Sequence, residues 1–228
     1  MGRIGGSPQP PSVSRETPLA DQQPLRANDF RAITGASVAE VERLGRYLEL
    51  LCRWQARINL VGRGTLDDPW RRHFLDSAQL ARLLPAGNPK LIDLGSGAGF
   101  PGLVLAILTR AQVRLVESDQ RKCAFLHEAA RVTGVSVRID NARIESLEPN
   151  ACDTVTARAL APLPELLAYS CKLLAPQGSC LFLKGRNWRA ELTQAEQSWN
   201  MRVTPIQSRS DSTGVILKID ELSERHER

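Results

Sequence analysis

The residues best suited to chemistry lie in and around a glycine-rich turn. Asp93 closes a short apolar run, Gly95, Gly97 and Gly99 follow at alternate positions, and Phe100 comes directly after them. Because glycine has no side chain, a turn of this kind between a strand and a helix lets a ligand contact bare backbone. The pattern therefore predicts a nucleoside-binding turn at the carboxyl end of a strand.

Two carboxylates discriminate between nucleoside ligands. Residues 97–102 match the G-x-G-x-x-G pattern of dinucleotide-binding turns, and Glu117 ends the next expected strand, where an acid binds ribose hydroxyls. Asp93, however, precedes the first glycine by two residues, where a carboxylate favours a cationic ligand over a pyrophosphate. The chain after the fifth expected strand is also too short for the second domain of a dehydrogenase. S-adenosylmethionine is the expected cofactor, and a nicotinamide dinucleotide is the alternative.

The elements around this turn alternate between strands and helices. Expected strands are 90–94, 113–117, 135–139, 152–157, 179–184, 201–206 and 215–219, and expected helices are 102–109, 120–132, 162–174 and 188–199. Such alternation predicts a Rossmann-like α/β fold with a doubly wound, mostly parallel seven-stranded sheet. The loop from Ser208 to Gly214 is too short for a parallel crossover, so the last two strands are expected to form a C-terminal antiparallel hairpin.

The N-terminal part divides into two segments. Residues 1–28 are rich in Pro and Ser and are expected to form a disordered tail. Residues 29–87 are expected to form a small, basic helical cap: Ser37 and Glu40 make a capping box, and Asp68-Pro69 starts a second helix. Residues 88–228 are left for the cofactor-binding domain.

Composition and charge indicate which kinds of binding partner are expected. The 228 residues are 42% hydrophobic and carry a net charge of +5, and residues 1–90 hold 13 basic against 9 acidic side chains. This imbalance suggests a polyanionic partner, although an ordinary solvated helix surface would also explain it. The longest apolar run near the glycines is too short to cross a membrane. The five cysteines include no C-x-x-C pair, so neither a disulfide framework nor a metal site is expected. This cysteine usage predicts a cytoplasmic location.

Beyond the tail, the chain resembles the RsmG (GidB) family of methyltransferases, which make 7-methylguanosine in small-subunit ribosomal RNA. The matching segments are Asn59-Leu60, Arg72 to Ser77, Ile92 to Gly102, Glu117-Ser118, Lys122 to Leu126, Thr156 to Ala159 and Leu183 to Gly185. Class I methyltransferases in general share only the acid and the glycines. The Phe-Pro-Gly sequence and the upstream R-H-F-L-D-S segment point to this family.

The resemblance implies a class I methyltransferase fold, S-adenosylmethionine as cofactor and 16S ribosomal RNA as substrate, and the enzyme is expected to be a monomer. It also implies roles for individual residues. Cofactor contacts are expected from Asp93, the three glycines and Phe100, from Glu117 on the ribose, from Ile144 and Glu145 beside the adenine, and from Arg158. Arg158 and Lys184 are the expected catalytic residues, to hold an RNA phosphate or the guanine O6. Their alternative role is a structural ion pair with Asp93 or Glu145.

The implied reaction requires little chemistry from the protein. Guanine N7 has a lone pair and no proton, so direct in-line displacement needs no general base, and the enzyme works by positioning. Residues 157–162 lack the Asn/Asp-Pro-Pro-aromatic signature of enzymes that methylate exocyclic amines, and Cys152 does not follow a proline as a cytosine-attacking nucleophile does. Both departures favour methylation at a ring nitrogen.

Three further residues invite a different interpretation. His73, Asp76 and Ser77 are a possible catalytic triad by type, but their spacing on one helix argues against it. We expect His73 and Asp76 to tie the cap to the cofactor domain by hydrogen bonds. Two alternative functions stay open at this point: a methyltransferase of the same fold acting on a small molecule or a protein, and a non-catalytic ribosome assembly factor.

Overall fold

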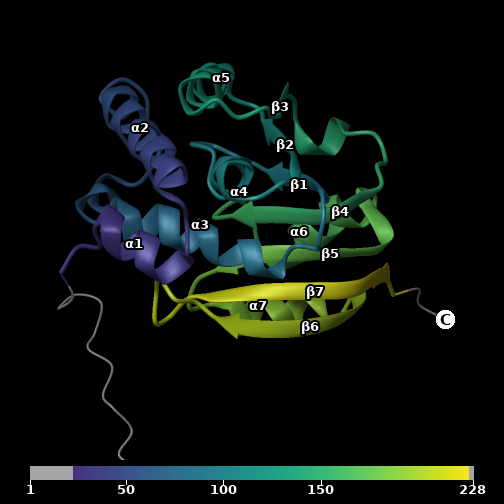
Figure 1. The fold of residues 1–228 in the computed structure, drawn as a ribbon. Coiled ribbons are helices and arrows are strands. Elements are labelled where there is room, and N and C mark those ends of the chain that lie inside the picture. The colour runs from purple at the N-terminus through teal and green to yellow at the C-terminus, as the bar shows by residue number, and fades with distance from the viewer. Residues whose placement is uncertain (1–22, 226–228) are drawn as a thin grey trace, which may run out of the picture.

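A seven-stranded sheet runs through the protein (Figure 1). The computed structural model describes residues 23–225. The strands lie in the order β3-β2-β1-β4-β5-β7-β6. Their bounds are β1 Lys90–Leu94, β2 Gln112–Glu117, β3 Arg138–Asn141, β4 Cys152–Arg158, β5 Leu174–Lys184, β6 Trp199–Gln207 and β7 Val215–Glu224.

The direction of the strands follows from the connections between them. The first five strands are parallel, and each is followed by a helical crossover, except that β3 leads to β4 through a short 3-10 turn. β7 is antiparallel to both β5 and β6. This arrangement confirms the expected α/β fold with a mostly parallel sheet and a C-terminal hairpin.

Strand and helix bounds differ from the expected ones at several places. The third strand was expected from residue 135 but begins at Arg138. Gly134, in the left-handed conformation, ends the preceding helix, and the Val135 N–H donates to the Ala130 carbonyl at 3.1 Å. This hydrogen bond commits residue 135 to the helix end and leaves a shorter strand.

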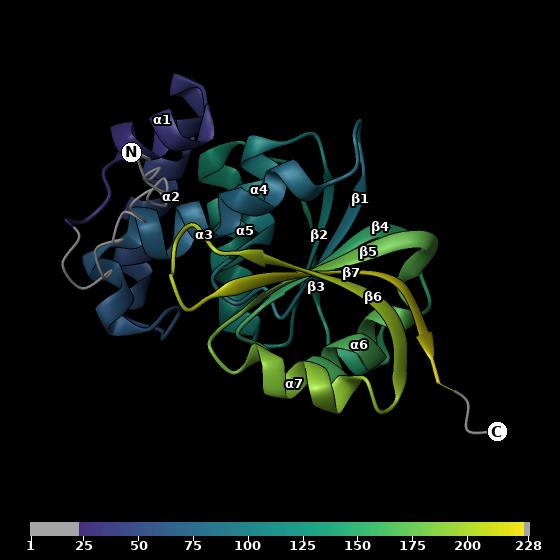
Figure 2. The same cartoon turned by 90° about the horizontal axis from the view of Figure 1, so that it is seen from below.

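Helices cover both faces of the sheet (Figure 2). α4 (Gly102–Leu108) and α5 (Gln120–Thr133) lie on one face together with the N-terminal helices, and α6 (Leu163–Cys171) and α7 (Trp188–Ala195) lie on the other. α6 and α7 end three and four residues earlier than expected. The buried apolar side chains form two clusters, one on each side of the sheet.

The cap contains a helix that the sequence pattern did not predict. α1 (Ala27–Thr34) precedes α2 (Val38–Gln55), whose N-terminus has the expected capping box between Ser37 and Glu40. Leu25, within the expected tail, is buried, and its N–H donates to Asp68 at 2.9 Å. The tail boundary at residue 28 is therefore wrong for residues 23–28, while residues 1–22 lie outside the described part of the chain.

The second cap helix is less regular than expected. A π-helical turn over Trp70–Leu75 leads into α3 (Asp76–Ala78) and then into a 3-10 turn over Gln79–Leu83. The wider π turn accommodates three consecutive buried residues, from His73 to Leu75. Asp68 still caps this segment, because its carboxylate accepts from the Arg71 N–H and pairs with the Arg71 guanidinium at 2.7 Å.

Aromatic packing joins the cap to the cofactor domain. The Tyr47 ring of α2 stacks on Phe100 of the glycine-rich turn, with ring centroids 5.2 Å apart, and its hydroxyl donates to the Ala98 carbonyl. Phe74 packs edge-on against both of these rings. The cap therefore rests directly on the turn that the sequence identifies as the ligand site.

No helix within residues 23–225 combines the length and apolarity needed to cross a bilayer. All five cysteines carry free thiols.

Phe74 provides a test of this packing. Its side chain is fully buried among Tyr47, Trp70 and Phe100. Phe74→Ala should lower the free energy of unfolding by about 3–5 kcal/mol, because it removes apolar burial and leaves a cavity. Val38→Ala, at a side chain that is 56% exposed, is the control and should change it by less than about 0.5 kcal/mol. Urea denaturation measures both, and equal effects would contradict the packing role.

Candidate active site

The glycine-rich turn has an unusual backbone that its residues permit. Gly95, Gly97 and Gly99 have φ angles of +60°, +55° and +91°, a region that other residues rarely adopt. The Gly97 N–H donates to the Glu117 carboxylate at 2.8 Å. The other Glu117 carboxylate oxygen accepts from the Asp119 N–H, also at 2.8 Å. The predicted pair of turn and acid is thus brought together at the ends of β1 and β2.

Asp93 lies beneath the turn and is almost completely buried, with 1% of its surface exposed. Its carboxylate accepts from the Thr156 hydroxyl at 2.7 Å and from the Gly102 N–H at 3.3 Å. A Cβ at Gly102 would lie 2.7 Å from the Asp93 Cβ, so this position requires glycine. Burial raises the pKa of Asp93 to about 6, against the hydrogen bonds from Thr156, Ser96 and Gly102, which lower it.

A cavity of about 650 Å³ opens above the turn. Its walls come from the turn, the cap, the ends of β4 and β5, and the β6–β7 loop. The lining includes Gly95, Gly97, Phe100, Arg158 and Lys184 among the predicted residues. Asp93, Gly99 and Glu117 are not part of this lining.

Ile144 and Glu145 are placed apart from this cavity. They belong to a 3-10 turn over Ile144–Ser146, and neither lines the cavity. The Glu145 carboxylate accepts from the Tyr169 hydroxyl at 3.0 Å. Their predicted contact with an adenine ring stays a prediction.

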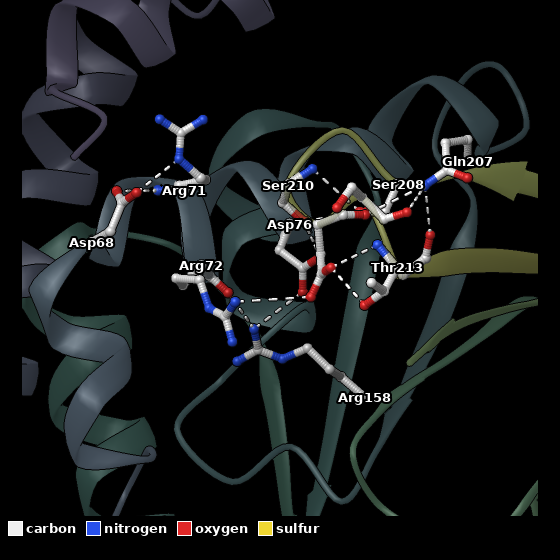
Figure 3. A network of polar contacts seen from close by, with 12 residues as sticks. Asp68, Arg71, Arg72, Asp76, Arg158, Gln207, Ser208, Ser210 and Thr213 are labelled. Carbon is white, nitrogen blue, oxygen red and sulfur yellow. Dashed lines mark hydrogen bonds and ion pairs between the residues drawn. The ribbon is translucent and has the colours of Figure 1, made fainter. Parts of the chain in front are cut away.

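Arg158 stands at the carboxyl end of β4, as expected, and forms an ion pair. Its partner is Asp76, at 3.3 Å, and it also donates to the Arg72 carbonyl at 3.1 Å (Figure 3). Its guanidinium lies 4.8 Å from the centroid of the Phe100 ring. The alternative that Arg158 pairs with Asp93 or Glu145 is wrong, because the cap places a third carboxylate closer.

Lys184 is also paired, with a carboxylate other than the two expected ones. Its ammonium lies 2.5 Å from the Glu191 carboxylate and donates to the Ala161 carbonyl at 3.0 Å. The side chain is only 10% exposed. Pairing with Asp93 or Glu145 is therefore wrong here too, and a direct catalytic contact stays a prediction.

Asp76 joins three segments of the cavity wall. In addition to Arg158 of β4, it accepts from the Ser210 hydroxyl of the β6–β7 loop at 2.5 Å and from the Gln79 side chain at 3.2 Å. Figure 3 shows Arg158 and Ser210 approaching Asp76 from different elements. Asp76 ties the cap to the cofactor domain, as expected.

His73 contacts the cofactor domain in a different way from the expected one. Its Nε2 lies 2.7 Å from the Thr65 hydroxyl, within the cap, and its ring stacks on Phe100 with centroids 4.9 Å apart. Because the Thr65 hydroxyl donates to the Gly62 carbonyl at 2.6 Å, Nε2 is the nitrogen that carries the proton. The expected hydrogen bond from His73 to the domain is wrong.

The electrostatic surroundings keep His73 neutral. Burial and the nearby Arg158 and Arg72 lower its pKa to about 3. The Ser77 hydroxyl is fully buried and donates to the His73 carbonyl at 2.7 Å, so the three residues form no triad. Within residues 23–225, no group of three His, Cys, Asp or Glu side chains is placed to hold a metal ion.

The β6–β7 loop contributes residues that sequence reasoning missed. Ser208, Ser210 and Asp211 line the cavity, and Asp211 lies 3.8 Å from the Arg72 guanidinium. The direction of the hairpin strands could have identified this loop as part of the site. Because β6 runs in the same direction as β5, the loop after it emerges at the edge where the parallel strands end, which is the ligand-binding edge of an open α/β sheet.

This sheet order, with the glycine turn after β1 and an acid after β2, defines a class I methyltransferase fold. Solved structures of this class are similar at low sequence identity. A SAM-dependent methyltransferase from Aquifex aeolicus is 16% identical, with a TM-score of 0.54 over 68% of this chain and 95% of that chain. TYW2 from M. jannaschii, solved in complex with AdoMet, is 14% identical, with a TM-score of 0.54 over 75% of this chain and 80% of that chain.

Sequence comparison gives the family. The profile of the family described as rRNA small subunit methyltransferase G matches residues 40–213, and the chain belongs to this family. The ribosomal RNA small subunit methyltransferase G of Rhodospirillum centenum is 53% identical over 88% of this chain and 93% of its own length. The protein of the same name from Paramagnetospirillum magneticum is 53% identical over 83% and 93%. The resemblance predicted from the residues is confirmed.

The conformation of the turn can be tested with two glycines of similar φ. Gly99→Ala should lower the free energy of unfolding by about 3 kcal/mol, because backbone strain adds to a steric clash. The new Cβ would lie 2.7 Å from the Tyr47 hydroxyl. Gly87→Ala, at φ +92° with nothing within 4 Å, should cost only the strain, about 1 kcal/mol. Thermal and urea denaturation measure both, and equal losses would show that the Tyr47 contact does not matter.

The raised pKa of Asp93 predicts a pH dependence of stability. The folded protein, with a pKa of about 6, binds this proton more tightly than the unfolded chain, where the value is near 3.8. The contribution of Asp93 to the free energy of unfolding should therefore fall as pH rises from 4 to 6 and stay constant above that. Asp93→Asn should lack this step in urea denaturation at a series of pH values. Parallel pH profiles for the two proteins would contradict the shift.

Proposed function

We propose that the protein transfers the methyl group of S-adenosylmethionine to N7 of a guanine in the 16S ribosomal RNA of the small subunit. The observation that carries the proposal is the glycine turn with Asp93 beneath it and Glu117 beside it, in a chain of this family. The turn forms part of the wall of a cavity that Arg158 and Lys184 also line.

The residues around the turn suit the cofactor. Gly95 and Gly97 offer bare backbone at the cavity wall, and the Asp93 carboxylate beneath the turn suits a ligand with two positive groups. Glu117 would bind the ribose hydroxyls, Phe100 would contact the cofactor from the turn, Arg158 would lie at the mouth of the site, and Ile144 with Glu145 would flank the adenine. S-adenosylmethionine supplies an activated methyl group when bound.

The protein needs to position the nucleophile rather than activate it. N7 of guanine has a lone pair and no proton, so no base is required, and the neutral His73 is already engaged by Thr65. Alignment of the target atom with the methyl group is worth several kcal/mol. Arg158, 17% exposed and in the cavity wall, is the side chain best placed to hold an RNA phosphate or the guanine O6.

The cap is the proposed RNA-gripping surface. Seven arginines lie between Arg43 and Arg72, and the Arg72 side chain is exposed at the rim of the cavity. Arginine side chains provide the electrostatic attraction that phosphate backbones require. We propose that the protein acts on the ribosomal subunit in the cytoplasm, as a monomer and without a membrane or metal partner.

The decisive experiment uses radiolabelled S-adenosylmethionine and small subunits from a strain that lacks this methylation. Label should appear in 16S RNA, and chemical cleavage at 7-methylguanosine should map it to a single position. Label in protein or in a small molecule would support the alternative methyltransferase. Binding to the subunit without any label would support a non-catalytic assembly factor. Fully methylated subunits are the control.

Arg158 allows a sharper test of the same reaction. Arg158→Ala should lower kcat/KM for small subunits about 100-fold, because a charged group loses its contact in a largely buried site. Arg202→Ala, at a side chain that is 63% exposed on the edge strand β6, is the matched control and should change it less than about twofold. Steady-state methyl transfer measures both. Equal activity of the two variants would show that Arg158 does not contact the substrate.

A further inference from the structure

The segment after β4 has a strained backbone beside the cavity. Ala159 has a φ of +51° and is one of two non-glycine residues with a positive φ within residues 23–225. A left-handed alanine costs about 1–2 kcal/mol relative to ordinary backbone. Such conformations persist where the surrounding structure holds them and are concentrated at functional sites.

An ion pair holds this segment from the side of β5 and α7. The Lys184 ammonium donates to the Ala161 carbonyl at 3.0 Å and pairs with the Glu191 carboxylate at 2.5 Å. The same Glu191 carboxylate accepts from the Leu163 N–H at 2.8 Å. The two charged side chains thus bind the backbone on both sides of Pro162 and limit how far the segment can move.

The held segment presents an exposed apolar side chain. Leu160 is 37% exposed, and the only other exposed large hydrophobic side chain in the described part of the chain is Val38 of the cap. A Cβ added to Gly95 would lie 2.4 Å from the Leu160 Cδ1, so the leucine lies over the bare backbone of the turn. Its neighbours Arg158 and Ala159 line the cavity, as Gly95 does.

We infer that Leu160 packs on the flat face of the target guanine and that the Lys184–Glu191 pair positions it there. This inference rests on the proposed function and adds a base-contacting residue to it. The edges of guanine are polar, but its face is apolar, and an exposed leucine next to the reacting turn gains buried surface only when a ligand covers it. Excluding water from that face also strengthens the proposed electrostatic contact between Arg158 and an RNA phosphate or the guanine O6.

Leu160 is expected to contribute to RNA binding and not to cofactor binding. Leu160→Ala should raise KM for unmethylated small subunits about tenfold, because an apolar contact of a few methyl groups is lost from the substrate pocket. The Kd for S-adenosylmethionine, measured by calorimetry, should change less than about twofold, and so should kcat at saturating subunits. Leu160→Met should retain most of the affinity for subunits that Leu160→Ala loses, because methionine keeps an apolar side chain of similar volume. Val38→Ala is the control for loss of an exposed apolar side chain.

The positioning role of the Lys184–Glu191 ion pair can be tested with a separate variant. Glu191→Gln, which keeps the size of the side chain and removes its charge, should raise KM for subunits in the same direction and leave the Kd for S-adenosylmethionine unchanged. In the double variant with Leu160→Ala, the two effects should not add, because Glu191 acts through the leucine. Additive effects would overturn the positioning role.

The outcomes distinguish this inference from the proposed function. No methyl transfer to small subunits by the unaltered protein would overturn the proposed function and the inference with it. If the unaltered protein methylates subunits and Leu160→Ala does so with the same KM, the inference alone is overturned. An equal loss of S-adenosylmethionine affinity in Leu160→Ala would also overturn it, because the leucine would then contact the cofactor.

Discussion

The packing of the Phe100 ring is the contact on which the rest of the site depends. Tyr47 and His73 of the cap stack on this ring, and the Arg158 guanidinium lies 4.8 Å from its centroid. Phe100 directly follows the last glycine of the turn, so these contacts fix the turn from the side of the cap. The cap is therefore part of the candidate active site and not an appendage to the sheet and its helices.

The distribution of charge follows from this packing. The cap covers the edge where the parallel strands end, and it brings Asp76 to Arg158, which would otherwise face the cavity without a carboxylate partner within the described chain. A half-buried arginine held by one carboxylate, one carbonyl and an aromatic ring is oriented before a substrate arrives. Preorganisation of this kind suits the proposed reaction, in which the enzyme positions a nucleophile that has no proton to lose.

Several elements were predictable because neighbouring residues determine them. The capping box of Ser37 and Glu40, the strand over residues 90–94 and the hairpin closed by residues 208–214 all follow from short-range spacing. The π turn at Trp70 and helix α1 did not, because tertiary packing of consecutive apolar residues decides the first, and the eight-residue α1 depends on the packing of Phe30 against Trp70, which is distant in the chain. The role of the β6–β7 loop was accessible from strand direction but not from its residue types.

The sequence by itself determined the fold class, the family and the identity of the cofactor, because glycine spacing, strand periodicity and acid position are local properties. Only the tertiary structure decided which charges pair. Asp76, Arg158 and Ser210 are far apart in the chain, and Lys184 meets Glu191 only because α7 folds back beside β5. Ion-pair partners depend on distances of a few ångströms between separate elements, and residue types alone contain no such distances.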